Sequence, residues 1–214
     1  MKKTISILGS TGSIGKTTLN IIEKKNKIFS IYLLSANKNV NLISSQIKKY
    51  KPKIFIVNDF LSYTKIKKKF KNKKTKIFNK FENLKLKKSD ITICAIPGIQ
   101  GLEPTIYITK FSKKVLLANK ESVICGWNLI YKEAIKFGVK IIPIDSEHFS
   151  IMKLIENTKL IDVKKIYLTA SGGPFLNYKV SQLKKIKPKD AIKHPKWKMG
   201  KKISVDSATM MNKV

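Results

Sequence analysis

The stretch that decides the fold is KKTISIL at residues 2–8, followed directly by GSTGSIG at residues 9–15. The apolar run predicts a buried strand, and the residues from Ile14 to Lys25 predict a helix. Glycines between them allow a sharp turn and a close approach of the backbone to a ligand. The N–H groups and the dipole at the start of a helix attract an anion. The stretch therefore predicts a phosphate-binding strand–turn–helix unit, the local arrangement of a dinucleotide site.

The spacing of these glycines leaves alternatives open. Gly9, Gly12 and Gly15 form G-x-x-G-x-x-G, whereas the usual dinucleotide fingerprint is G-x-G-x-x-G. The tripeptide GKT at residues 15–17 also resembles the end of a P-loop, but Ser10 stands where that motif needs its first glycine. We favour the dinucleotide interpretation over a P-loop or a turn without a ligand.

The next apolar run, IYLL at residues 31–34, is followed by the polar loop SANKN at residues 35–39. An NAD site needs an acidic residue here to hold the ribose 2′-hydroxyl. The loop has no carboxylate and instead offers Asn37, Lys38 and Asn39, which suit a 2′-phosphate. The sequence therefore favours NADPH over NADH, with a solvated polar loop as the alternative.

The formal net charge of +32, from 45 basic and 13 acidic residues, would normally indicate a nucleic-acid partner. Every basic residue is lysine, whereas proteins that read nucleic acid favour arginine for its bidentate geometry. We interpret lysine-rich runs such as residues 65–76 as solvated surface, and we expect no specific nucleic-acid partner.

Cys94 and Cys125 lie in apolar contexts and are expected to be core thiols of a reducing compartment. No targeting segment precedes the first strand, and no apolar run approaches the roughly 20 residues that span a bilayer. The sequence therefore predicts a soluble cytoplasmic protein without a membrane partner.

Strand and helix signals alternate along the first 149 residues. The predicted strands cover residues 4–8, 29–34, 53–57, 91–96, 114–118 and 140–144. The predicted helices cover residues 14–25, 40–50, 62–71, 101–111 and 121–137. This alternation predicts a doubly wound, Rossmann-like α/β sheet with ligands at the carboxyl ends of its parallel strands.

The pattern changes after Phe149, where we place a boundary between a cofactor domain (1–149) and part of an α+β catalytic domain (150–214). An amphipathic segment at Ser150–Ile155 is followed by a predicted strand at Val163–Thr169 and a loop rich in Gly, Pro and Ser. Some 65 residues are too few for a domain with a large core of its own.

Several polar groups stand where ligands would bind. Asp145 and Glu147 alternate after the last predicted strand, so both carboxylates can face one point and hold Mg²⁺ or Mn²⁺, with a surface turn as the alternative. Ser171, in the small-residue loop after residue 169, can hold an oxyanion. His194 and Trp197 stand in a loop that can form a lid, unless Trp197 anchors that loop on the core. Hydroxyl, amide and ammonium groups at residues 204–213 suit a phosphate.

The strings LGSTGSIG, LLANKES, PIDSEH, LTASGGPF and HPKWKMGKKISVDSATMMNK together resemble the 1-deoxy-D-xylulose 5-phosphate reductoisomerase family across the whole chain. The resemblance implies an enzyme of non-mevalonate isoprenoid biosynthesis, an oxidoreductase and isomerase that forms 2-C-methyl-D-erythritol 4-phosphate. It implies NADPH, a divalent metal (Mg²⁺ or Mn²⁺, or else Co²⁺), a sugar phosphate substrate and, at full length, a homodimer.

The resemblance also implies roles for individual residues. The implied metal ligands are Asp145 and Glu147, which with Lys120 and His194 make up the catalytic set. The implied cofactor residues are Gly9, Ser10, Thr11, Gly12, Ser13, Ile14, Asn37, Lys38, Asn39, Asn119 and Glu121. The implied substrate residues are Lys120, Ser146, Ser171, His194, Trp197, Ser207, Asn212 and Lys213.

The family motif continues as N-K-G-x-E, and its Glu is the third metal ligand. Val214 stands where that Gly belongs, and the sequence ends there. We therefore expect a truncated form without the third carboxylate. The rival interpretations are a P-loop phosphotransferase, a basic nucleic-acid binder and a different NADP-linked dehydrogenase.

Overall fold

The computed structural model describes residues 2–211. The chain divides into a first unit, Met1–Asp145, and a second unit, Ser146–Val214. This division falls between Asp145 and Ser146, whereas the sequence places a boundary after Phe149. The assignment of a cofactor domain to residues 1–149 and of a partial catalytic domain to residues 150–214 stays a prediction.

Within residues 2–145, seven parallel strands form one sheet in the order β4-β3-β2-β1-β5-β6-β7. Their bounds are β1 (Lys3–Leu8), β2 (Phe29–Ala36), β3 (Ile54–Val57), β4 (Lys76–Phe78), β5 (Ile91–Cys94), β6 (Lys114–Leu117) and β7 (Lys140–Pro143). Six of them match the predicted strands to within two residues at each end. The sequence interpretation missed β4.

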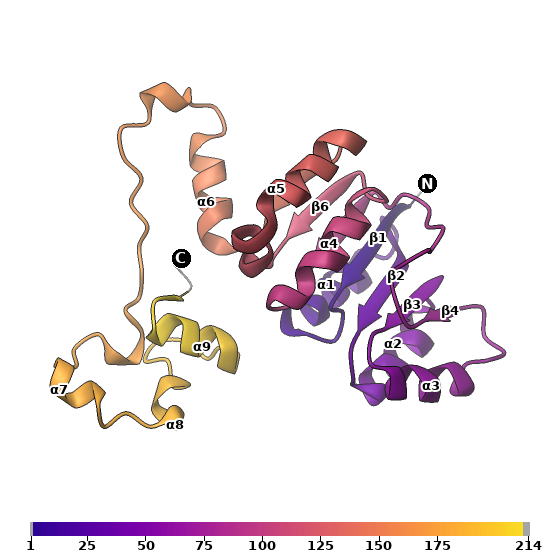
Figure 1. The fold of residues 1–214 in the computed structure, drawn as a ribbon, viewed down its shortest axis with the longest axis horizontal. Helices are drawn as coiled ribbons and strands as arrows, with labels where there is room; N and C mark the ends of the chain where they lie inside the picture. The colour runs from indigo at the N-terminus through magenta and orange to yellow at the C-terminus, as the bar shows by residue number, and fades with distance from the viewer. Residues whose placement is uncertain (1, 212–214) are drawn as a thin grey trace. The chain divides into compact units, whose positions relative to one another are not determined.

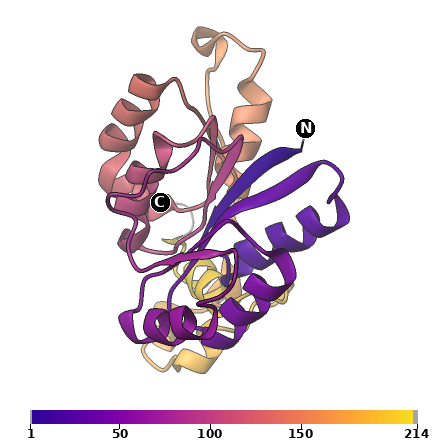
Figure 2. The same cartoon turned by 90° about the vertical axis from the view of Figure 1, so that its right-hand side faces the viewer.

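Helices cover both faces of this sheet (Figures 1 and 2). Their bounds are α1 (Ser13–Lys24), α2 (Val40–Tyr50), α3 (Phe60–Lys69), α4 (Leu102–Thr109) and α5 (Lys120–Phe137). One apolar cluster lies under α1, α2 and α3, and the other lies under α4 and α5. Two covered faces explain why the strands read as short continuous apolar runs.

Alternation along β3 shows how one strand serves both clusters. Phe55 and Val57 pack under α1–α3, whereas Ile54 and Ile56 pack into the opposite cluster. Successive side chains of a strand point to opposite faces, so all four are buried. Full burial of a side chain such as Phe55 contributes about 2 kcal/mol to folding.

The strand order reverses at β1. The chain runs outward from β1 to β2, β3 and β4, and then returns to the other side of β1 as β5. The N–H of Ala95, just after β5, donates to Leu8 O of β1 at 3.0 Å. In open α/β sheets, ligands bind in the crevice at such a switch point. The sheet is therefore the predicted doubly wound, Rossmann-like fold.

The second unit contains α6 (Ser146–Ile155), α7 (Val180–Leu183), α8 (Pro188–Ala191) and α9 (Lys201–Ala208), with short 3₁₀ turns between them. The turn at Gly173–Phe175 lies directly against α9. A Cβ atom added to Gly173 would lie 2.7 Å from Ser207 O and 2.8 Å from Ala208 Cα. Glycine therefore permits this close approach of two backbones.

The predicted strand at Val163–Thr169 is wrong: this segment has no assigned strand (Figure 1). A strand exists only by pairing its backbone with a neighbour. The described residues of the second unit contain no other strand to supply that partner. Ile166, Tyr167 and Leu168 consequently remain exposed.

The prediction of two core thiols is half right. Cys94 is buried in β5, and burial raises the pKa of its thiol to about 12. Cys125 is exposed, because the buried stripe of α5 runs through Ser122, Gly126, Ile130 and Ala134 and leaves position 125 off that stripe. Among residues 2–211, no helix has the length and apolar character needed to cross a bilayer.

Asp90 ties β1 to the start of β6. Its Oδ2 accepts from Thr4 N at 2.8 Å and from Thr4 Oγ1 at 2.9 Å, and its Oδ1 accepts from Lys113 Nζ at 2.8 Å. The Lys113 bond, followed by the two Thr4 bonds, lowers the pKa of Asp90 from 3.8 to about 2. The stabilisation is therefore present above pH 3.8 and is lost as the pH falls through about 2.

We expect Asp90→Asn to lower the free energy of unfolding by about 1 kcal/mol at pH 7, after allowance for solvent screening. The difference from the parent chain should shrink at pH 2, because the parent carboxylate is then largely protonated. Urea unfolding at pH 7 and pH 2 measures this difference in the free energy of unfolding, with the substitution of exposed Glu82, Glu82→Gln, as the control. An equal difference at both pH values would contradict this role.

Candidate functional site

The glycine turn after β1 is fixed by backbone bonds. Gly9 has a φ of +82°, and its N–H and that of Ser10 both donate to Ser35 O, at 3.1 and 2.8 Å. A Cβ atom on Gly9 would lie 2.6 Å from Ala95 O, a backbone atom beside β5. The turn therefore lies against the strands on both sides of β1, at the switch point of the sheet.

The N-terminus of α1 follows this turn. Gly12 is the N-cap, no side chain caps the helix, and its first turn carries no acidic residue. The N–H groups at Ser13, Ile14 and Gly15 have no acceptor within the helix, as at any helix start. Together with the helix dipole they can hold the phosphates of a dinucleotide. This geometry fits the predicted cofactor residues from Gly9 to Ile14, with Thr11 half-buried between the glycines.

Ser10 holds the turn in place through its side chain. Its hydroxyl is buried and donates to Gln46 Oε1 at 2.6 Å, and Gln46 Nε2 donates back to Ser10 O at 2.9 Å. Ser10 therefore fixes the turn to α2 through two hydrogen bonds with the buried Gln46 amide. Gln46 was not among the predicted residues, although a polar residue at a core position of an amphipathic helix is a signal in the sequence.

The predicted 2′-phosphate residues follow β2 at the same edge of the sheet. Asn37, Lys38 and Asn39 are all exposed. Asn39 Oδ1 also caps α2 by accepting from Leu42 N at 3.0 Å, and Lys38 O accepts from Ser62 Oγ at 3.1 Å. The backbone of the loop is thus held, while an ammonium and amides face solvent where a 2′-phosphate could bind.

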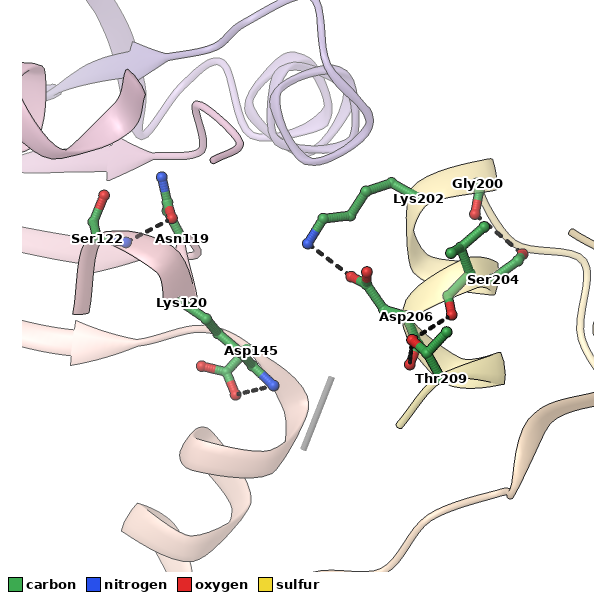
Figure 3. Close-up of polar contacts among 10 residues, drawn as sticks. Asn119, Lys120, Ser122, Asp145, Gly200, Lys202, Ser204, Asp206 and Thr209 are labelled. Atoms are coloured by element: carbon green, nitrogen blue, oxygen red, sulfur yellow. Dashed lines mark hydrogen bonds and ion pairs between the residues drawn. The ribbon is translucent and has the colours of Figure 1, made fainter. Parts of the chain in front are cut away.

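Asn119 braces the loop after β5. Its Oδ1 accepts from Ser122 N at 3.0 Å and caps α5 (Figure 3). Its Nδ2 donates to Gly98 O at 2.8 Å and, at shorter range, to Ile96 O. Both the oxygen and the nitrogen of the buried Asn119 amide are thus hydrogen-bonded within the protein, and the amide positions residues 96–98. Glu121 lies half-buried in the first turn of α5.

Lys120 and Asp145 converge from two strand ends of the first unit. Lys120 begins α5 after β6, and Asp145 follows β7. Lys120 Nζ lies 3.8 Å from Asp145 Oδ1, and both side chains are largely buried, at 20% and 16% exposure (Figure 3). The ammonium thus compensates the carboxylate in a site with little solvent.

Ser146 and Glu147 begin the second unit in the first turn of α6, where Ser146 Oγ donates to Glu147 Oε2 at 2.8 Å. Carboxylate oxygens are the ligands that Mg²⁺ and Mn²⁺ prefer. Among residues 2–211, however, no group of three or more His, Cys, Asp or Glu side chains could hold a metal. The two predicted ligands are carboxylates, but Glu147 lies in a helical turn, so the extended alternation that was predicted to aim both carboxylates at one point is absent.

Three predicted substrate residues meet in the second unit. Ser171 Oγ lies 2.9 Å from His194 Nε2 and 3.1 Å from Ser207 Oγ. His194 Nδ1 accepts from the N–H groups of Lys196 and Trp197, at 3.1 and 3.0 Å. A neutral His194 therefore carries its proton on Nε2, and this N–H donates a hydrogen bond to Ser171 Oγ. Segments far apart in sequence thus gather hydroxyl and imidazole groups at one point.

Trp197 stacks on His194, with ring centroids 4.7 Å apart and planes inclined by 11°. Trp197 is 56% exposed and does not anchor the loop in a core. On α9, which carries Ser207, Lys202 pairs with Asp206 at 2.7 Å (Figure 3). Asn212 and Lys213, the remaining predicted phosphate residues, lie outside the described residues.

Comparison with known families gives matches in both units of the chain. The model of the 1-deoxy-D-xylulose 5-phosphate reductoisomerase family matches residues 5–126. The model of that enzyme's C-terminal domain matches residues 141–214. The two matches cover both units.

Curated relatives carry the same name. The reductoisomerase of Pelagibacter ubique (strain HTCC1062) is 51% identical over 219 residues, covering all of this chain and 56% of the relative. That of Clostridium acetobutylicum is 41% identical over 217 residues, covering 99% of this chain and 56% of the relative. The chain thus spans about half the length of the curated relatives it matches.

Solved structures match in fold as well. The Zymomonas mobilis reductoisomerase in complex with NADPH superposes with a TM-score of 0.86 at 33% identity, covering 100% of this chain and 56% of that one. A DOX-P reductoisomerase with NADPH, fosmidomycin and magnesium gives 0.86 at 33%, covering 99% and 55%. The chain therefore belongs to the 1-deoxy-D-xylulose 5-phosphate reductoisomerase family.

Proposed function

We propose that this chain forms the NADPH-binding part and a portion of the catalytic part of a 1-deoxy-D-xylulose 5-phosphate reductoisomerase. The whole enzyme would rearrange its sugar phosphate substrate and reduce it to 2-C-methyl-D-erythritol 4-phosphate. The observation that carries this proposal is the glycine turn at the switch point, next to the polar loop Asn37–Asn39. Relatives solved with NADPH support it.

The cofactor residues would act in two groups. Backbone N–H groups at Ser13 and Ile14 would hold the pyrophosphate at the start of α1. Lys38, with Asn37 and Asn39, would hold the 2′-phosphate by charge-assisted hydrogen bonds. NADPH would supply the hydride, and the chain would orient it over the carboxyl edge of the sheet.

Asp145 and Glu147 would hold Mg²⁺, Mn²⁺ or Co²⁺ through their carboxylates. A bound divalent metal polarises substrate oxygens as a Lewis acid. A relative solved with magnesium supports this assignment. Lys120, within ion-pair distance of Asp145, would keep the carboxylate oriented and place a positive charge at the reacting end of the substrate.

The hydroxyl cluster of the second unit would bind the substrate phosphate. Ser171 and Ser207 supply O–H groups for the phosphate, and His194, which lies 2.9 Å from Ser171 Oγ, would contact the substrate. Asn212 and Lys213 would complete this set, Ser146 would lie beside the substrate, and the exposed Trp197 would cover it. A relative solved with fosmidomycin supports a site for a compound of this kind.

The other partners and the location follow the same proposal. The lysine-rich surface would bind no specific nucleic acid, the full-length enzyme would be a homodimer, and two free cysteines fit a reducing cytoplasm. A P-loop phosphotransferase is disfavoured because Gly9 is one residue out of register for that motif.

Titrations of the chain with NADPH, NADH and ATP test this proposal. We expect NADPH to bind about tenfold or more tightly than NADH, because only NADPH carries the charge that Lys38 meets. Lys38→Ala should weaken NADPH by about tenfold and leave NADH unchanged, whereas Lys24→Ala, at the far end of α1, should change neither. Equal affinities for NADPH and NADH, or preferential binding of ATP, would contradict it.

A further inference from the structure

Phe60 is exposed at the same edge of the sheet as the proposed cofactor site. It opens α3, directly after the end of β3, and its side chain is 67% exposed. Large aromatic side chains are normally buried, because their transfer from water is favourable. An exposed aromatic ring at a ligand-binding edge therefore suggests a ligand contact.

The first turn of α3 is tied to the loop Asn37–Asn39. Ser62 Oγ donates to Lys38 O at 3.1 Å, and Asn58 N donates to Ala36 O at 3.0 Å. The strands beneath them are paired in register, with Ala36 opposite Val57. Phe60 and the proposed 2′-phosphate residues thus stand on adjoining, directly bonded loops.

The position of Phe60 is fixed on both sides. Asp59 Oδ2 caps α3 by accepting from Ser62 N at 2.9 Å, and Asn79 Nδ2 donates to Val57 O at 2.7 Å and to Asn58 O at 3.1 Å. The Phe60 ring also packs against Tyr63, with centroids 6.2 Å apart. A ring on such a held turn offers a platform that loses little freedom when a ligand binds.

The charges around this turn suit a nucleotide. The pKa of Asp59 lies below its usual value, first because of the Ser62 backbone N–H and, to a smaller degree, because of Lys38 and Lys65. Both ammonium groups therefore lie close to the first turn of α3. An aromatic surface flanked by cations matches a base attached to a phosphorylated ribose.

We propose that the adenine ring of NADPH stacks on Phe60, an inference that rests on the proposed function. The pyrophosphate would lie at the end of β1 and the 2′-phosphate at the end of β2. The sheet order places β3 on the far side of β2 from β1, so a nucleotide continuing in that direction meets Phe60. Adenine is the flat, weakly polar group at that end of NADPH.

Binding of three probes to the 214-residue chain tests the proposal. NADPH contains both halves of the cofactor, 2′,5′-ADP only the adenosine half, and reduced nicotinamide mononucleotide only the other. Phe60→Ala should weaken NADPH and 2′,5′-ADP by a shared factor of about fivefold to a hundredfold, and leave the mononucleotide unchanged. Phe60→Tyr should bind as the parent does, because it keeps the ring.

Ile21→Ala is the control, since it truncates another exposed apolar side chain, on α1. Phe60→Leu separates stacking from general apolar contact. Because leucine cannot stack, this variant should show most of the loss of NADPH affinity that Phe60→Ala shows. NADPH binding by Phe60→Ala within about twofold of the parent chain would overturn the stacking proposal alone. Failure of the parent chain to bind NADPH would overturn the proposed function and this inference together.

Discussion

Gly9→Ala is expected to abolish NADPH binding and to lower the free energy of unfolding of the first unit by about 3 kcal/mol. The φ of +82° is unfavourable for alanine, and the new Cβ would lie 2.6 Å from Ala95 O. Ala95 N also donates to Leu8 O at 3.0 Å, so this backbone cannot withdraw without breaking the link between β1 and β5. Any relaxation must distort the turn that is proposed to hold the pyrophosphate.

Gly138→Ala is the matched control for Gly9→Ala. Gly138, the C-cap of α5, has a φ of +63° in the left-handed helical region, and a Cβ atom there would meet no atom within 4 Å. It should therefore cost only the backbone term, about 1 to 2 kcal/mol. Urea unfolding and NADPH fluorescence measure both variants. Similar losses of stability in the two would show that the contact with Ala95 is not what requires glycine at position 9.

Gly173→Ala is expected to separate the loop at residues 171–173 from α9. The φ is +63°, and the new Cβ would lie 2.7 Å from Ser207 O and 2.8 Å from Ala208 Cα. Because these are backbone atoms, α9 must move, and the 3.1 Å contact between Ser171 and Ser207 would be lost. We expect binding of fosmidomycin to weaken by tenfold or more, since a single charge-assisted hydrogen bond contributes about 1.5 to 3 kcal/mol.

Gly200→Ala provides the control in the same unit. Gly200 is the N-cap of α9, its φ is −63°, and no atom lies within 4 Å of an added Cβ. Ser207→Ala removes only the hydroxyl and should reproduce part of the loss. Calorimetry with fosmidomycin and circular dichroism of each variant measure these effects. Unchanged fosmidomycin affinity in Gly173→Ala would count against the hydroxyl cluster as the phosphate site.

Local sequence patterns were sufficient for most of the first unit. Apolar runs such as residues 54–57 predict strands buried on both faces, and the predicted helices 40–50 and 121–137 match α2 and α5 to within one residue. β4 was not predicted, because three residues in a lysine-rich stretch carry too little periodicity to indicate a strand. The strand forms through its pairing with β3, which is a tertiary contact.

The second unit was harder to predict, because its elements depend on distant partners. Residues 163–169 have the composition of a strand but no described neighbour with which to pair. The short helix α9 was missed, although it contains the predicted Ser207. Its buried residues, Ser204 and Ser207, are polar, so no apolar stripe marks the helix in the sequence.

Sequence motifs named the candidate site residues, but they did not identify residues that support the site through buried side-chain contacts. Ser171 and Ser207 were expected to hold a phosphate and His194 to contact the substrate; the three side chains lie within hydrogen-bond distance of one another, and their roles stay predictions. Gln46 under Ser10, and Ser62 beside Lys38, could not be identified, because their roles depend on side-chain directions across neighbouring helices. Phe60 was overlooked because exposure is a property of the folded chain.

An amide NMR titration of the chain with NADPH tests directly whether the turn after β1 and the loop after β2 bind the cofactor. We expect saturable shifts of the Gly12, Ser13 and Ile14 amides, where the pyrophosphate would bind, together with those of Lys38 and its neighbours, where the 2′-phosphate would bind. NADH should shift the first group and spare the second. Saturable NADPH binding that leaves the amides of Gly12 to Ile14 unmoved would contradict it.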